Sequence, residues 1–191
     1  MEKYLYLTEV EWVDTWINGG EIPISLASSY LSDERNGILT PDENLIHESP
    51  VPIPSFQEFG IRIGRCRNLT MTNTAYNGIK LPDFHNANYY QEDGLILSFC
   101  NSFSEHIGKR FRKKACVKIL NIEKLGRVID KQLGCKRIAG DCKYTNDHQR
   151  NHFLKSNDDS WQEEYRLFWR TTQSKWVKIP PGTAQLMSVF D

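Results

Sequence analysis

Glycines and prolines divide this chain of 191 residues into short elements. The pair Gly19-Gly20 and the single Gly134 each follow a run of apolar residues at helical spacing, and Pro180-Pro181-Gly182 separates two strand-like runs. Prolines at positions 50, 52 and 54 interrupt regular structure in a further stretch. No apolar run between these breaks approaches the roughly 18 residues that a membrane-spanning helix needs. The sequence therefore predicts a core of short strands and helices and no membrane partner.

Helical and strand periodicities alternate along the chain and predict an α+β fold. Helical runs follow Thr8, lead into the basic run 109–114, and begin again after Asn121. Residues 56–64 alternate as a strand does, whereas the Asn-rich stretch 68–90 predicts little regular structure. Further strand-like runs occupy residues 3–7, 21–26, 94–100, 115–120, 164–170, 175–179 and 185–190.

The composition is that of a soluble globular protein. With 39% hydrophobic and 25% charged residues, the chain is neither a disordered tail nor a membrane protein, and we expect residues 1–191 to form one domain. Its 24 basic and 24 acidic residues cancel, so the overall charge indicates no particular partner. Five scattered cysteines favour reduced thiols over disulfides, and the N-terminus reads as a strand rather than a signal peptide. We therefore expect a cytoplasmic protein.

The most distinctive stretch runs from Trp161 to Arg166 and places Gln162 and Glu164 two residues apart where a strand is predicted to begin. Side chains at i and i+2 point to the same face of a strand, so both would enter one cleft while Glu163 points away. A carboxylate beside a neutral amide is a usable chemical pair. The plainer interpretation is a polar strand edge with an aromatic anchor.

The order of elements resembles the ADP-ribosyltransferase superfamily: a first strand, a short helix closed by Gly-Gly, a Ser-rich second strand, a central strand and a late Gln-x-Glu. More narrowly, the chain is similar to small bacterial proteins, some from toxin or anti-phage systems, that share a late pattern. Here that pattern is Lys155, Trp161, Gln162, Glu163, Glu164, Tyr165 and Arg166. The resemblance implies a split pair of small mixed or antiparallel sheets with flanking helices, and NAD held in a cleft between the sheets.

The same resemblance implies roles for individual residues. Glu164 would be catalytic and stabilise the positive charge that develops on the ribose as nicotinamide leaves, and we expect its replacement to leave the fold intact. Gln162 would lie beside an acceptor other than Arg on a nucleic acid or a protein. The usual His or Arg of the first strand is missing, so a cation such as Arg62 or Arg65 would take its place. The full set implied to bind the cofactor is Tyr4, Tyr6, Ser28, Ser29, Tyr30, Arg62 and Ser98.

Several of these residues have plainer interpretations. Tyr4 and Tyr6 favour packing in a first strand, and Ser28 and Ser29 favour a turn. The basic run 109–114 is typical of a solvated helix end, but it is also a candidate surface for docking the acceptor. The residues implied in acceptor binding are Trp161, Lys109, Arg110 and Arg112. Two wider alternatives stay open: a binding module on the same fold that docks on nucleic acid or a partner protein without catalysis, and an antitoxin partner that holds the protein inactive.

Two cysteines and two histidines, Cys135, Cys142, His148 and His152, lie close enough in sequence to suggest zinc. The interval between Cys135 and Cys142 is wider than the two to four residues typical of a zinc site. The sequence therefore predicts no metal.

Overall fold

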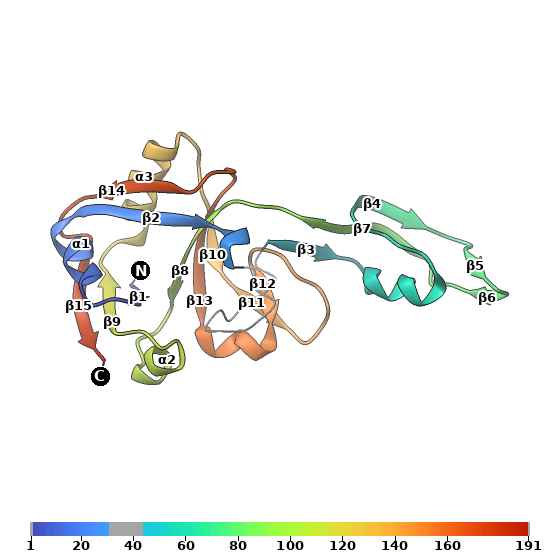
Figure 1. Cartoon of the computed structure of the whole chain (residues 1–191), viewed down its shortest axis with the longest axis horizontal. Coiled ribbons are helices and arrows are strands. Elements are labelled where there is room, and N and C mark those ends of the chain that lie inside the picture. Colours follow the sequence, from blue (N-terminus) through green and yellow to red (C-terminus); the bar gives the residue numbers. More distant parts are fainter. Residues whose placement is uncertain (1, 31–43, 191) are drawn as a thin grey trace.

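The computed structural model describes residues 2–30 and 44–190, which form an elongated molecule (Figure 1). One end is a compact part that holds both chain ends and most of the helices and strands. We call residues 44–91, which project from it, the arm, and the rest of the described chain the body. The body buries a large cluster of apolar side chains, and the arm buries a smaller one of its own.

The body is built on an antiparallel sheet with the strand order β10-β13-β8-β1-β9-β15. In chain order these strands are β1 (Lys3–Leu7), β8 (Leu95–Cys100), β9 (Ala115–Ile119), β10 (Ile138–Asp141), β13 (Glu164–Trp169) and β15 (Ala184–Val189). A second ribbon pairs β2 (Gly20–Leu26) with β14 (Lys175–Ile179), and the end of β2 also pairs with the start of β8. The α+β class that the sequence predicts is confirmed.

The two faces of the sheet have different neighbours because side chains alternate along each strand. On β13, Tyr165, Leu167 and Trp169 point into the main core, which also contains side chains from α1 (Trp12–Asn18) and α3 (Ile122–Leu133). The start and end of α3 follow the sequence prediction, since the Asn121 side chain accepts a hydrogen bond from the Lys124 N–H and the left-handed Gly134 ends the helix. The other side chains of β13 point to the opposite face.

That opposite face lies under a segment that we call the cover, residues 142–162. The cover contains the parallel strands β11 (Lys143–Thr145) and β12 (Leu154–Ser156) and the 3-10 helix η3 (Asn157–Gln162). Phe153 packs against Phe168 and Ile96 of the sheet, and Arg166 donates a hydrogen bond to the carbonyl of His152. These contacts hold the cover against β13 and β8. The short helix α2 (Glu105–Arg110) follows β8.

The arm corrects two sequence predictions. Residues 53–59 form the 3-10 helix η2 (Ile53–Phe59), closed by left-handed Gly60, so the strand-like alternation predicted from residue 56 is wrong. The stretch 68–90 is largely strand, because β4 and the long β7 pair across it and bury Phe84 against η2. The arm strands are β3 (Leu45–Glu48), β4 (Cys66–Met71), β5 (Ala75–Tyr76), β6 (Ile79–Lys80) and β7 (Phe84–Gln91).

Across residues 2–30 and 44–190, no helix is long and apolar enough to cross a membrane.

Candidate functional site

Glu164 is the first residue of β13, and its backbone is held on two sides. Its N–H donates to the hydroxyl of Tyr144 at 2.9 Å, and its carbonyl accepts from the Cys142 N–H at 2.8 Å. Across the sheet it lies opposite Cys100 of β8. The position is therefore fixed both by the sheet and by the cover.

The Glu164 carboxylate is the centre of a buried ion network. Arg166 donates from Nε to Oε1 at 2.7 Å and from Nη2 to Oε2 at 3.1 Å. Lys155 Nζ donates to the same Oε2 at 2.7 Å and to the side-chain carbonyl of Gln162 at 2.6 Å. The Gln162 amide in turn donates to Asp159. We call Lys155, Gln162, Glu164 and Arg166 the Glu164 cluster; all four belong to the late sequence pattern.

The charge of the cluster is set by competition between burial and pairing. Burial alone would raise the pKa of Glu164, but the nearby guanidinium of Arg166 and ammonium of Lys155 outweigh it and lower the pKa to about 2. Glu164 is therefore ionised at neutral pH. Such a carboxylate can stabilise a cation or accept hydrogen bonds, but it cannot act as an acid.

The structure corrects two expectations about Gln162 and Glu164. Gln162 does not lie on the strand but ends η3, and a left-handed Glu163 (φ 43°) separates it from β13. The two side chains nevertheless meet at Lys155, while Glu163 points away and accepts a hydrogen bond from Ser102. The expectation of an open cleft is wrong for this carboxylate, because Glu164 is only 6% exposed. Its replacement is therefore not expected to leave the fold undisturbed.

Three residues implied in cofactor binding share the sheet face of Glu164. Ser98 lies opposite Arg166 in the β8–β13 register, and Tyr4 lies opposite Cys100 in the β1–β8 register. Tyr6 packs in the same small cluster as Tyr4 and Cys100, and its hydroxyl donates to the carbonyl of Ser104 and accepts from its N–H. The packing interpretation of Tyr6 is thus supported, since both of its hydrogen-bonding roles are filled.

The other implied cofactor residues are more distant. Ser28 and Ser29 lie in η1 (Ala27–Tyr30), where the Ser28 hydroxyl donates to Asp93 and the Ser29 hydroxyl bonds to the backbone of Leu26. These are turn roles, and Tyr30 is exposed at the end of the same turn. Arg62 lies on the arm, so the structure does not bring it to the Glu164 cluster (Figure 1).

The residues implied in acceptor binding come together at the junction of α2 and η3. Arg110 stacks over the Trp161 ring with its guanidinium carbon 3.9 Å from the ring centroid, and the Phe111 ring lies 4.8 Å from the same ring. Lys109 and Arg112 are exposed beside them. We call Lys109, Arg110, Arg112 and Trp161 the Trp161 surface. Trp161 of this surface is the residue immediately before Gln162.

The structure does not assemble the suggested zinc set. Cys142 is the buried first residue of the cover, whereas Cys135 follows α3. His152 stacks on Phe168 with ring centroids 3.8 Å apart, and His148 lies beside the arm. Within the described part of the chain, no group of three or more His, Cys, Asp or Glu residues is placed to hold a metal ion.

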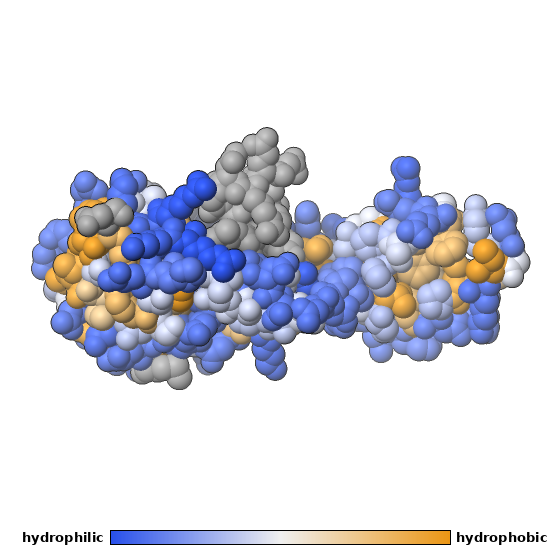
Figure 2. Space-filling view, turned by 90° about the horizontal axis from the view of Figure 1, so that it is seen from below, coloured by the Kyte–Doolittle hydropathy of each residue, from blue (hydrophilic) through white to orange (hydrophobic). Residues whose placement is uncertain are grey.

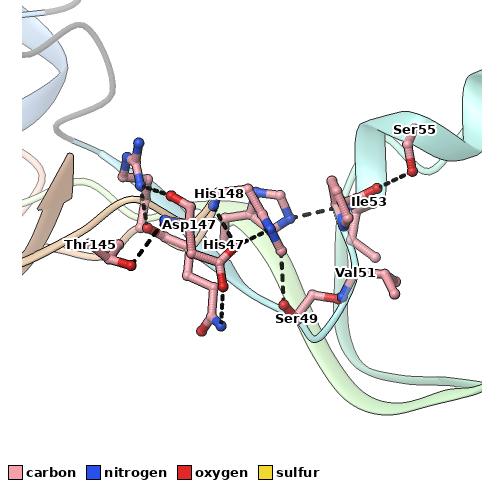
Figure 3. Close-up of polar contacts among 11 residues, drawn as sticks. His47, Ser49, Val51, Ile53, Ser55, Thr145, Asp147 and His148 are labelled. Carbon is pink, nitrogen blue, oxygen red and sulfur yellow. Dashed lines mark hydrogen bonds and ion pairs between the residues drawn. The ribbon is translucent and has the colours of Figure 1, made fainter. Parts of the chain in front are cut away.

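His148 instead helps to join the arm to the body (Figure 3). Its Nε2 bonds to the carbonyl of Ser49, and its ring lies 4.6 Å from the ring of His47 on β3. His47 accepts a hydrogen bond from the Ile53 N–H, and its own backbone bonds to that of Arg150. Burial, together with His148 and Arg150, lowers the pKa of His47 to about 4. His47 is therefore uncharged at neutral pH.

No protein-family model, curated protein sequence or solved structure matches the chain. The site is therefore interpreted from its own geometry. Sequence reasoning missed the roles of Lys155 and Arg166, although both stand in the late pattern. The signal that could have revealed these roles is that both residues are cations in or beside apolar strand sequence. A cation buried there needs an anion close by.

Proposed function

We propose that the protein is an NAD-dependent mono-ADP-ribosyltransferase that modifies a macromolecule, either a nucleic acid or a protein. The observation that supports this most is the convergence of Lys155 and Arg166 on the carboxylate of Glu164, with Gln162 held by the same Lys155 ammonium. An ionised carboxylate on a rigid strand is the group that this reaction needs, because a fixed anion stabilises developing positive charge.

In the proposed reaction the nicotinamide leaves with the electron pair of the glycosidic bond, and positive charge develops on the ribose carbon. Glu164 stabilises that charge. A nucleophilic atom of the acceptor then forms the new bond to the same carbon and releases its proton to water. Gln162, at the junction of the cover and β13, would lie near the incoming acceptor, and the Trp161 surface would dock the macromolecule that carries it.

The hydrogen bonds of the Glu164 carboxylate indicate which contact must change before NAD can bind. Its Oε2 atom accepts from Lys155, which belongs to the cover, and from Nη2 of Arg166, whereas Oε1 accepts from Nε of Arg166 on the same strand. A movement of the cover would take Lys155 away from Oε2, which could then accept a hydrogen bond from a ribose hydroxyl while Arg166 continues to orient the carboxylate. The proposal therefore includes displacement of residues 142–162 when NAD binds.

A second candidate is a module on the same fold that binds nucleic acid without catalysis. It is favoured by the observation that both carboxylate oxygens of Glu164 already have cationic partners. The Trp161 surface supplies what such a module uses, namely the exposed cations Lys109, Arg110 and Arg112 beside an aromatic ring.

Incubation with NAD labelled in its adenylate phosphate and a cell extract separates the two candidates. The transferase proposal expects label in a macromolecule, and digestion with nuclease or protease then assigns the acceptor class. Glu164→Gln, measured under conditions where circular dichroism shows it folded, should lose the labelling. The matched control is Glu163→Gln, which removes the neighbouring but exposed carboxylate and should label as the wild type does.

Wild-type turnover by the folded Glu164→Gln protein would contradict the transferase proposal. Nucleic-acid binding that weakens steeply with salt, without any labelling, would favour the binding module. In that case Arg110→Ala should weaken binding, whereas Arg62→Ala, an exposed arginine on the arm, should change it little.

A further inference from the structure

Strand β15 forms one edge of the body sheet. It pairs with β9 along one side, and among residues 2–30 and 44–190 no strand pairs with its other side. The N–H and C=O groups on such an open side are a template for another strand. β15 is therefore a candidate surface for adding a strand from a second molecule.

The side chains of β15 do little to prevent such pairing. Leu186 is 43% exposed and Val189 is 51% exposed, and the strand Ala184–Val189 contains neither a charged residue nor a proline. Its one protective feature is a bulge between Leu186 and Ser188. The edge strand at the opposite end of the sheet, β10 (Ile138–Asp141), is shorter and carries an aspartate, as protected edges do.

The apolar surface extends beyond the strand. Helix α1 packs beside β15, and Val10 and Trp12 at its start are exposed as well. Figure 2 shows hydrophobic side chains gathered at the end of the body where the C-terminus lies. An exposed apolar area next to an open strand edge is typical of an interface rather than of a solvated surface.

We infer that this surface is covered by a second copy of the same chain, with two β15 strands pairing antiparallel across a two-fold axis. Such an interface brings together the same patch of the two copies, so that patch must not carry charges that would repel each other. β15 meets this condition because it carries no charge, and no like charges would then face each other across the strand pair. A charged partner strand would find no opposite charge on β15.

Sedimentation velocity over a concentration series tests this inference with three variants. The wild type should sediment as a dimer at the higher concentrations. Val189→Lys and Leu186→Lys should sediment as monomers at the same concentrations, because each places two like charges in a symmetric interface. Ile79→Lys is the matched control, since Ile79 is 59% exposed but lies at the tip of the arm, and it should remain dimeric.

Thermal melting should show that all variants are folded, and deuterium uptake by residues 184–189 should slow as the wild-type concentration rises. A wild type that stays monomeric throughout overturns the inference. So does a dimer that survives Val189→Lys, or one that Ile79→Lys disrupts equally, because the interface would then lie elsewhere. None of these readouts depends on the proposed transferase activity.

Discussion

Replacing Glu164 by glutamine should destabilise the protein by about 3–5 kcal/mol, the range for breaking a buried ion pair by removing one partner. The amide has nearly the shape of the carboxylate, so packing changes little. The substitution removes the negative charge that Lys155 and Arg166 share, and both cations remain almost fully buried without the Glu164 carboxylate. The penalty arises from those two cations and not from a cavity.

The pH dependence gives a second measure of the same interaction. Folding lowers the pKa of Glu164 from 4.5 to about 2, so the folded state holds the ionised form. Its contribution is fully present above the unfolded pKa and is lost as the pH falls through the folded pKa. At about 1.4 kcal/mol per pH unit this window corresponds to about 3 kcal/mol, the same order as the cost of breaking the pair.

Urea unfolding of the wild type and Glu164→Gln, from neutral pH down through this window, measures both effects. The difference in unfolding free energy should be largest at neutral pH and should shrink as the wild-type carboxylate is protonated. Glu163→Gln is again the control, because that side chain is exposed and should change stability by less than about 1 kcal/mol. A Glu164→Gln penalty no larger than the control, or one that is constant with pH, would refute the reasoning.

Two further predictions concern packing and the arm. Gly94→Ala should cost about 1–3 kcal/mol in urea unfolding, because an added Cβ would lie 2.4 Å from the Phe168 ring and 2.5 Å from the Trp169 carbonyl oxygen; an unchanged midpoint would show that the sheet yields easily. Because folding lowers the pKa of His47 from 6.5 to about 4, its contribution to stability is present above pH 6.5 and is lost as the pH falls through 4. Deuterium exchange around residues 47–53 should accelerate over that interval in the wild type, relative to the intrinsic rate, and a flat profile would count against it.

The body could be predicted from the sequence because its elements carry local signals. The apolar run in β8, the cap at Asn121 and the stop at Gly134 each mark a boundary, and the structure places those elements there. The arm could not be predicted in this way. Its strand β7 consists largely of polar and aromatic residues, and it becomes a strand through pairing with β3 and β4 rather than through its own periodicity.

The site shows the same division between local and long-range information. Glu164 and Gln162 were identified from their spacing, yet a turn at Glu163 changes the geometry that the spacing predicts. Lys155 reaches the carboxylate from a separate strand of the cover. Such a contact is set by tertiary packing. A short motif therefore indicates which residues come together, but not whether the site that they form is open to solvent or buried.

The arm departs from the body and returns to it at neighbouring points. Leu45 and Gln91 are paired across β3 and β7, and the carbonyl of Asn44 accepts a hydrogen bond from the Glu92 N–H. An insertion whose ends already touch can lengthen, shorten or be exchanged with little strain on its host. His47 and Ser49 at the base of the arm bond to Arg150 and His148 of the cover, so only the part of the arm beyond these contacts could change its reach independently of the chemistry beneath the cover.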